Sequence, residues 1–216
     1  SMTRNLEGMI VTVPHKPAMA QLIGQLGERG REAGTINALR RQADGTWFGD
    51  MFDGFACVQR LLDDARRLEG QTVLQVGAGG VGRAIAFALA HAGISAIKLH
   101  DIDVARAQAL KADLAAGFPD LQTEIGEPIP EDRTIVINCS PLGMGPDDPF
   151  PIDPKTLNGE MMAIDVVLEP EISPFLAAAR SLGCATLNGR EIVEANFQAI
   201  SVFFGLVTAE ESPAVD

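Results

Sequence analysis

Three glycines in the middle of the chain have the spacing of a loop that binds a dinucleotide. Gly77, Gly79 and Gly82 form G-x-G-x-x-G between an apolar run at residues 72–76 and an alanine-rich segment at residues 83–91. In such a strand–turn–helix unit the first glycine permits a tight turn and the second lets the backbone approach a pyrophosphate, while the third lets helix and strand pack closely. Free N–H groups at the start of the helix also attract phosphates. The motif therefore predicts a nucleotide-binding loop made of Gly77, Ala78, Gly79, Gly80, Val81 and Gly82, and its alternative is a purely structural glycine turn.

An acidic residue after the next apolar run indicates which dinucleotide is preferred. Asp101 follows the predicted strand at residues 96–99, and a carboxylate at this point accepts hydrogen bonds from the adenosine ribose hydroxyls. It would repel the 2′-phosphate of NADP, and no arginine follows immediately to neutralise that phosphate. Asp101 therefore favours NAD and makes NADP the less favoured cofactor. Asp103 suits the N-cap of the next helix. The alternative to a ribose contact is that Asp101 and Asp103 both merely cap that helix.

The charge balance and the scattered cysteines argue against several classes of function. The chain of 216 residues has a formal net charge of −12, which disfavours nucleic-acid and anionic-membrane partners. Cys57, Cys139 and Cys184 have neither paired nor metal-like spacing, so we expect free thiols in a reducing cytoplasm. The three histidines form no i, i+4 pair, and we expect no metal site. The longest apolar stretch is too short to span a membrane.

Strands and helices alternate through the second part of the chain. Apolar runs that predict strands lie at residues 72–76, 96–99, 134–138, 162–167 and 184–186. This alternation is typical of an α/β protein with a doubly wound parallel sheet of Rossmann type. We therefore expect residues 69–186 to form a nucleotide-binding domain of that class.

The segments before and after this domain have different patterns. Residues 1–68 are expected to form part of an α/β substrate domain. It has a strand at 9–13, a helix at 17–30, a hairpin around Asp44-Gly45 and a helix at 54–68. In residues 187–216, apolar side chains at helical spacing predict a helix over 191–204 that returns to the first domain. Five apolar residues have this spacing, namely Ile192, Val193, Phe197, Ile200 and Phe204, and most of them are predicted to be core. The polar tail at 208–216 is expected to fray.

Short motifs are distributed over nearly the whole chain, and each one taken singly is uninformative. They are V-T-V-P-H-K (11–16), G-T-I-N (34–37), G-D-M-F-D-G (49–54), the glycine loop, N-C-S-P-L-G-M (138–144) and D-V-V through S-P-F-L (165–176), with a final helix from Gly189. A lysine after a strand is usually a solvated charge, and Asp-Gly is usually a turn. As an ordered set, however, the motifs resemble those of the shikimate dehydrogenase family, which includes quinate/shikimate dehydrogenases. In that family the second motif reads G-A-V-N-T.

The resemblance implies an activity and a set of site residues. It implies an oxidoreductase that transfers hydride between a nicotinamide cofactor and a cyclic hydroxy acid similar to shikimate or quinate, and it leaves a homodimer open as the assembly. Lys16 and Asp53 would be the catalytic pair, with Asn37 and Thr12 as substrate contacts. The nicotinamide side would be lined by Asn138, Ser140, Pro141, Gly143 and Met144. Val167 and Gly189 would also bind the cofactor.

The implied chemistry leaves the roles of the catalytic pair open. A base must take the hydroxyl proton as hydride leaves, and lysine can do so only when it is neutral. A neighbouring carboxylate favours the charged form of lysine, so we interpret Asp53 mainly as an orienting group and hydroxyl acceptor. Which of Lys16 and Asp53 moves the proton stays open. The alternatives to this enzyme are a non-catalytic dinucleotide-binding regulator and a folate-linked dehydrogenase of related build.

Several positions depart from the family pattern, and they concern the substrate. Ile10 and Leu168 replace an asparagine and a tyrosine, Met51-Phe52 replaces Asn-Thr, and Asn196 replaces a glutamine. Phe52 and Asn196 are counted among the predicted substrate contacts, and the lost polar groups predict a less hydroxylated ring acid than shikimate. Alternatively, Met51-Phe52 is ordinary core. Family members also carry a strand–helix–strand unit ahead of the first motif, so we expect part of the substrate domain to be missing from this sequence.

Overall fold

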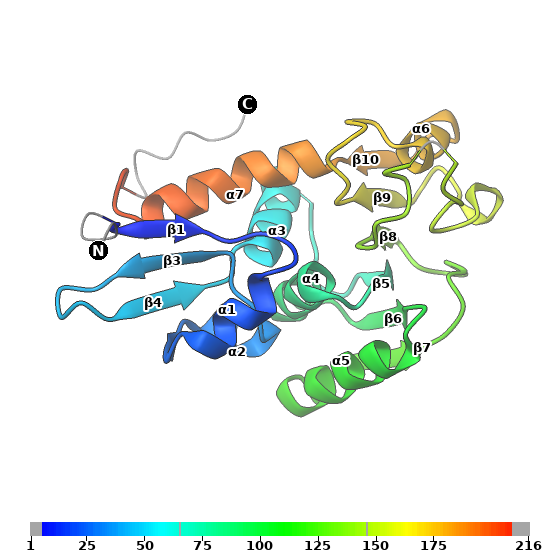
Figure 1. Cartoon of the computed structure of the whole chain (residues 1–216). Helices are drawn as coiled ribbons and strands as arrows, with labels where there is room; N and C mark the ends of the chain where they lie inside the picture. The colour runs from blue at the N-terminus through cyan, green and yellow to red at the C-terminus, as the bar shows by residue number, and fades with distance from the viewer. Residues whose placement is uncertain (1–5, 65, 146, 209–216) are drawn as a thin grey trace.

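The computed structural model describes residues 6–64, 66–145 and 147–208, and these residues form two β-sheets (Figure 1). The larger sheet has six parallel strands in the order β10-β9-β8-β5-β6-β7. Its strands are β5 (Thr72–Val76), β6 (Ala96–His100), β7 (Gln122–Ile125), β8 (Ile135–Asn138), β9 (Met162–Asp165) and β10 (Ala185–Leu187). This is the strand order of a Rossmann fold, with its switch point between β5 and β8. The predicted α/β class is confirmed.

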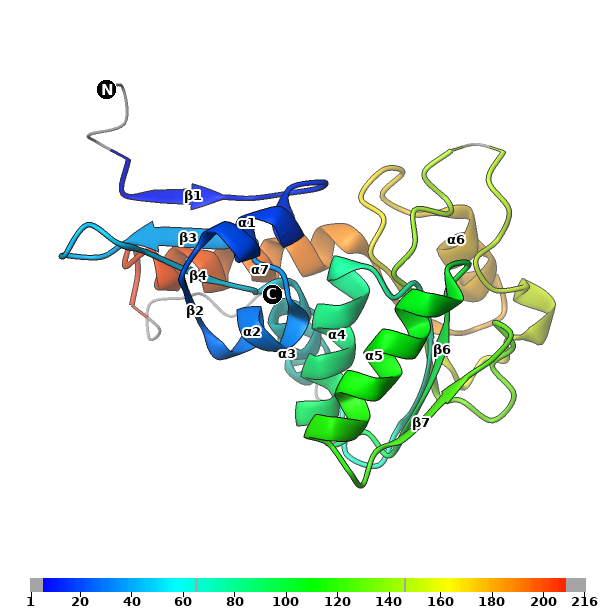
Figure 2. The same ribbon diagram turned by 60° about the horizontal axis from the view of Figure 1, so that its bottom comes forward.

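Helices cover both faces of the six-stranded sheet. They are α4 (Gly80–His91), α5 (Val104–Gly117), α6 (Pro174–Ser181) and the short 3-10 helix η1 (Pro154–Thr156). Val73 belongs to the core under α4 and α5, which Figure 2 shows side by side, whereas Leu74 belongs to the core under α6. Because the central strands are buried on both faces, their sequences are mainly apolar, with Gln75 and Lys98 as buried exceptions. No helix in the part of the chain that the structure describes is long and apolar enough to cross a membrane.

The edge strand β7 is not predicted by the pattern of apolar residues. Gln122 and Glu124 are exposed, while Thr123 and Ile125 are half-buried. A strand at the edge of a sheet needs few apolar residues, so its pattern is too weak to be recognised in the sequence. It is a strand because its backbone pairs with β6 in parallel register.

The smaller sheet has four strands in the order β1-β3-β4-β2. The elements around it are β1 (Gly8–Ile10), α1 (Lys16–Leu22), β2 (Gln25–Leu26), α2 (Glu28–Ala33), β3 (Ala38–Arg41), β4 (Trp47–Asp50) and α3 (Asp53–Asp63). β3 and β4 form the hairpin predicted around Asp44-Gly45. Gly45 supplies a φ of 86° in this turn, and Thr46 N donates to the Asp44 side chain.

The prediction of one helix over residues 17–30 is wrong. The chain leaves α1 at Ile23 with extended backbone and forms β2, which pairs with β4, before α2 begins. A Cβ at Gly27 would lie 2.3 Å from Asp50 Cγ, so glycine allows the chain to pass this close to β4. The predicted strand at 9–13 ends at Ile10, and the predicted helix at 54–68 ends at Asp63. Apart from Thr208, the tail expected to fray lies outside the described residues.

The last helix, α7 (Gly189–Phe203), extends from the larger sheet to the smaller one. It begins beside β10, and Figure 1 shows it running towards β1. A capping box starts it, in which Asn188 and Glu191 accept hydrogen bonds from each other's backbone N–H. Further along, Ile200 packs in one cluster with Phe52. The C-terminal helix therefore covers elements that belong to the first part of the chain.

Two of the apolar residues named for α7 are not in the core. Phe197 is 55% exposed and Val193 is only half-buried, whereas Ile192 and Ile200 are buried. At 100° per residue, Phe197 lies about 140° around the helix from Ile192. The apolar residues of α7 therefore do not all face one side.

Candidate active site

Three polar side chains from separate elements converge on the carboxylate of Asp53. Lys16 is the first residue of α1 and Asp53 the first of α3, while Asn37 directly precedes β3 and Asn196 lies in α7. Lys16 Nζ donates to Asp53 Oδ2 at 2.6 Å. The Nδ2 atoms of Asn37 and Asn196 both donate to Asp53 Oδ1 at 2.7 Å. The fold thus brings together four of the residues that the sequence analysis assigns to catalysis and substrate binding.

The ion pair of this cluster is nearly buried. The side chains of Lys16 and Asp53 are each 11% exposed. Taking two charges out of water is costly unless further hydrogen bonds satisfy them, and the two asparagine amides supply such bonds to Asp53. Asn37 is itself fixed, because its Oδ1 accepts a hydrogen bond from Phe52 N at 3.0 Å. An arrangement of this kind can orient a substrate hydroxyl and accept its proton.

Two other predicted substrate residues lie outside the cluster. Phe52 is 3% exposed, and its ring centroid lies 5.1 Å from that of Phe203 in the core under α7. Met51 is 1% exposed, so the structure supports the alternative that Met51 and Phe52 are core residues. We therefore leave Phe52 out of the substrate contacts. Thr12 lies on the exposed loop before α1, where its carbonyl accepts from His15 N at 2.9 Å.

The glycine loop after β5 has the space and the backbone shape that a phosphate group requires. Gly77 has a φ of 100°, which side-chain-bearing residues rarely adopt. A Cβ on Gly82 would lie 2.1 Å from Gly77 O, so glycine is needed for this close contact. Apart from Gly79 itself and its two chain neighbours, no described residue has an atom within 4 Å of a Cβ built on Gly79. This open space adjoins the first turn of α4, which has no side-chain cap, and it fits a dinucleotide pyrophosphate.

Asp101 follows β6 and faces this loop. Its Oδ2 accepts a hydrogen bond from Ala78 N at 2.7 Å, and its Oδ1 accepts one from Asp103 N at 2.8 Å. Asp103 caps α5 by accepting a hydrogen bond from Ala105 N at 3.1 Å. The carboxylate of Asp101 is therefore held against the glycine loop and does not cap the helix.

The loop after β8 lies beside the glycine loop because β5 and β8 are adjacent parallel strands. A Cβ on Gly77 would lie 2.7 Å from the backbone carbon of Cys139. Asn138 organises this second loop, since its Nδ2 donates to Leu142 O at 2.9 Å and its Oδ1 accepts from Ser140 Oγ at 2.6 Å. Asn138 and Ser140 therefore hold the backbone of the predicted nicotinamide side in place.

The remaining residues predicted to bind the cofactor on this side of the glycine loop differ in exposure. Pro141 and Met144 are exposed, whereas Gly143 and Val167 are buried. A Cβ on Gly189 would lie 2.4 Å from Val167 O, so this glycine lets the start of α7 pack closely against the chain that follows β9. Among these five residues, only Pro141 and Met144 have side chains that are free to meet a ligand.

Asp165, at the end of β9, is a buried carboxyl group next to the same loop. It accepts hydrogen bonds from Asn138 Nδ2 at 2.9 Å, Val167 N at 3.1 Å and Ser173 Oγ at 2.5 Å. Burial raises the pKa of Asp165 above its ordinary value, while these hydrogen bonds oppose the rise. A carboxyl group with a raised folded-state pKa stabilises the fold at low pH, and this stabilisation is lost as the pH rises through that pKa.

The substitution Asp165→Asn is therefore expected to raise the melting temperature at neutral pH. The amide removes the buried charge and can still bond to Val167 N and Ser173 Oγ. The difference in melting temperature between Asp165→Asn and wild type should shrink as the pH falls, because the wild-type carboxyl group then becomes neutral as well. Thermal unfolding of both proteins from neutral to acidic pH measures the effect. Melting curves that stay a constant distance apart across this range would contradict the explanation.

Gln75 holds the glycine loop together, although the sequence analysis does not identify it. It lies in β5 and is fully buried. Its Nε2 donates to Gly77 O at 2.9 Å and to Gly82 O at 3.0 Å, so one side chain joins both ends of the loop. A glutamine inside an apolar run is the signal that could have revealed it, because a buried amide needs hydrogen-bond partners.

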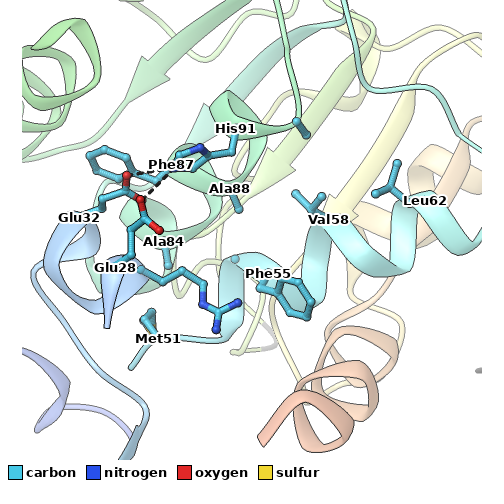
Figure 3. A pocket seen from close by; sticks show the side chains of 13 residues that line it. Glu28, Glu32, Met51, Phe55, Val58, Leu62, Ala84, Phe87, Ala88 and His91 are labelled. Carbon is cyan, nitrogen blue, oxygen red and sulfur yellow. Dashed lines mark hydrogen bonds and ion pairs between the residues drawn. The ribbon is translucent and has the colours of Figure 1, made fainter. Parts of the chain in front are cut away.

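A separate cavity of about 350 Å³ lies between α2, α3 and α4 (Figure 3). Phe55 and Phe87 give it an apolar lining, and at its edge His91 Nε2 lies 2.9 Å from Glu32 Oε1. It is lined by none of the residues predicted for catalysis or cofactor binding, so we do not place the active site there. Within the described ranges, no group of three or more His, Cys, Asp or Glu residues could hold a metal ion.

Sequence similarity identifies the family of this protein. No model of a known protein family matches the chain. The chain is, however, 36% identical over 191 residues to the shikimate dehydrogenase (NADP(+)) of Rhodospirillum rubrum, an alignment that covers 85% of this chain and 67% of that protein. The chain belongs to the shikimate/quinate dehydrogenase family.

Two further comparisons agree with membership of the shikimate/quinate dehydrogenase family. The quinate/shikimate dehydrogenase (NAD(+)) of Corynebacterium glutamicum is 31% identical over 206 residues, which cover 92% of this chain and 72% of that protein. The solved structure of quinate dehydrogenase from Corynebacterium glutamicum in complex with NAD has a TM-score of 0.84 at 28% identity, covering 94% and 74% of the two chains. The predicted family is confirmed, and its members are named for either NAD or NADP.

Proposed function

We propose that this protein transfers hydride between a nicotinamide dinucleotide and a cyclic hydroxy acid related to shikimate or quinate. The observation that carries the proposal is the cluster in which Lys16, Asn37 and Asn196 donate to the carboxylate of Asp53 at 2.6–2.7 Å. Relatives that are 31–36% identical are named for dehydrogenation of these two acids. The shared family and the donor cluster together support the same reaction.

We also propose a division of labour between two halves of the chain. The substrate half comprises residues 1–68 and 187–216, and the cofactor half comprises residues 69–186. Support comes from α7, which packs against α3 and against the core that contains Ala38 of β3. Arg83 of α4 joins the halves, since its Nε donates to Ala33 O at 3.0 Å.

The donor cluster and the glycine loop are near enough to serve one reaction. A Cβ on Gly80 would lie 3.2 Å from Thr35 Cγ2, so the two halves touch at this point. Thr35 precedes Asn37 by two residues, which span at most about 7 Å of extended chain. The side chains around Asp53 are thus held close to the proposed site of the dinucleotide.

The residues of the cluster have separate tasks in the proposed reaction. Oxidation of a secondary alcohol removes a hydride from its carbon and a proton from its hydroxyl group. The nicotinamide ring, when bound, supplies the hydride acceptor. Lys16 and Asp53 hold the hydroxyl group and take up its proton as a pair, and in the reverse direction they return it to the carbonyl oxygen. Asn37 and Asn196 keep the carboxylate of Asp53 in place.

We propose NAD as the preferred cofactor because Asp101 is held against the glycine loop. The substitution Asp101→Asn is expected to lower the ratio of kcat/KM with NAD⁺ to that with NADP⁺ by about tenfold or more, since the amide no longer repels a 2′-phosphate. Initial rates with both cofactors measure this ratio. Asp103→Asn is the matched control, because asparagine caps a helix as well as aspartate does. An unchanged ratio in Asp101→Asn would contradict the role of this residue.

The proposed function is tested by initial rates of NAD⁺ and NADP⁺ reduction with shikimate and with quinate. Reduction of either cofactor that depends on one of these acids supports the reaction class. A protein that binds NADH yet oxidises neither acid would contradict the proposed substrates. A protein that binds neither NADH nor NADPH would contradict the whole proposal.

A further inference from the structure

Thr35 carries a buried hydroxyl group at the contact between the two halves. The residue is 3% exposed. Its Oγ1 has no hydrogen-bond partner in the part of the chain that the structure describes. The matching motif of the family has alanine at this position, so the hydroxyl group distinguishes this chain from the family pattern.

The side chain of Thr35 lies against the first turn of α4. A Cβ built on Gly80, the first residue of that helix, would lie 3.2 Å from Thr35 Cγ2 and 3.7 Å from Thr35 Oγ1. The substituents on Cβ of Thr35 exchange staggered positions when χ1 rotates. The hydroxyl group can therefore take the position of the methyl group, which lies nearest to this turn. The space beside the neighbouring Gly79 is open.

A hydroxyl group that is buried without a partner costs free energy. This cost is offset if Thr35 Oγ1 forms a hydrogen bond in another state of the protein, such as one with a bound ligand. Phosphate groups bind at the N-terminus of a helix such as α4, and their charged oxygens are strong acceptors. We propose that Thr35 Oγ1 donates a hydrogen bond to a pyrophosphate oxygen of the bound dinucleotide. This inference rests on the proposed function, and it makes the substrate half a direct participant in cofactor binding.

The contact would also link the cofactor to the catalytic cluster. Asn37, two residues further on, donates to Asp53 and accepts from the backbone of Phe52. A dinucleotide that binds Thr35 therefore restrains the segment that positions Asn37. The loop at residues 34–37 would then contact the cofactor through Thr35 and the catalytic cluster through Asn37.

The test is a fluorescence titration of wild type, Thr35→Val and Thr35→Ser with NADH. Valine keeps the branched shape without the hydroxyl group, and we expect it to weaken NADH binding by about tenfold. Serine keeps the hydroxyl group, and its affinity should stay within about threefold of wild type. The melting temperature of free Thr35→Val should not fall, because the substitution removes an unpaired group. If the role of Thr35 were purely structural, Thr35→Val would lower the melting temperature, and the NADH affinities of Thr35→Val and Thr35→Ser would be similar.

Titration with ADP-ribose locates the contact on the ligand. ADP-ribose contains the pyrophosphate but lacks the nicotinamide, so Thr35→Val should weaken its binding as much as that of NADH. A loss confined to NADH would overturn the phosphate assignment. Equal NADH affinities of wild type and Thr35→Val would overturn the inference and leave the proposed function intact. Failure of the wild-type protein to bind either NADH or NADPH would overturn both.

Discussion

Substitution of Lys16 by methionine is expected to lower kcat/KM by about a thousandfold or more, while NADH affinity stays within about threefold of wild type. Methionine keeps most of the volume of the side chain but removes the ammonium group that lies 2.6 Å from Asp53 Oδ2. The substrate hydroxyl group then loses a positioning donor and half of the pair that takes its proton. Steady-state rates in both directions and a titration with NADH measure the two quantities separately.

The stability of Lys16→Met must be measured separately, because the substitution removes one partner of a nearly buried ion pair. A buried pair that loses one partner is generally destabilised by about 3–5 kcal/mol. Asn37 and Asn196 still donate to Asp53, which lessens that cost. Thermal unfolding separates lost catalysis from lost folding, and Lys111→Met, at an exposed position of α5, controls for the change of charge. If folded Lys16→Met turns over within about tenfold of wild type, its assigned role is wrong.

Substitution of Gly79 by alanine is expected to weaken NADH binding by about tenfold or more and to leave the fold intact. Gly79 has a φ of −72°, which alanine adopts without strain. Since no described residue beyond its chain neighbours lies within 4 Å of the added Cβ, the free protein can accommodate it. In the complex the methyl group would occupy the space through which the backbone approaches the pyrophosphate. A titration with NADH and a thermal unfolding curve measure both effects.

Gly82→Ala is the matched comparison, because its added Cβ meets the protein and not the ligand. That Cβ would lie 2.1 Å from Gly77 O and 3.0 Å from Gln75 Nε2. We expect its melting temperature to fall by several degrees, in contrast to that of Gly79→Ala. If Gly79→Ala bound NADH as tightly as wild type, the pyrophosphate would not lie at this loop.

Local patterns were enough to predict the Rossmann sheet and its glycine loop. A central parallel strand must be apolar on both faces, so β5, β6, β8, β9 and β10 all correspond to predicted runs. Gly77 has a positive φ, and Gly82 makes a contact that leaves no room for a side chain. The spacing of the glycines in the sequence predicts both requirements. The family follows from short motifs in a fixed order, each of which is local in the sequence. Local patterns did not predict β2, β7 or the ends of several helices.

Contacts between distant parts of the chain required the tertiary structure. Asn196 lies 159 residues from Asn37 in the sequence, yet Asn37 Nδ2 donates to Asn196 Oδ1 at 3.3 Å because α7 packs over the smaller sheet. The same packing buries Phe52, which the motif alone places at the substrate. β7 is a strand through its pairing with β6, and Thr35 reaches the glycine loop through the contact of the two halves. The sequence by itself thus determined the fold class, the family and the nucleotide loop, since these follow from local patterns. The motifs named Lys16, Asn37 and Asn196, but that all three donate to Asp53 was decided only by the packing of helices and sheets, which no local pattern specifies.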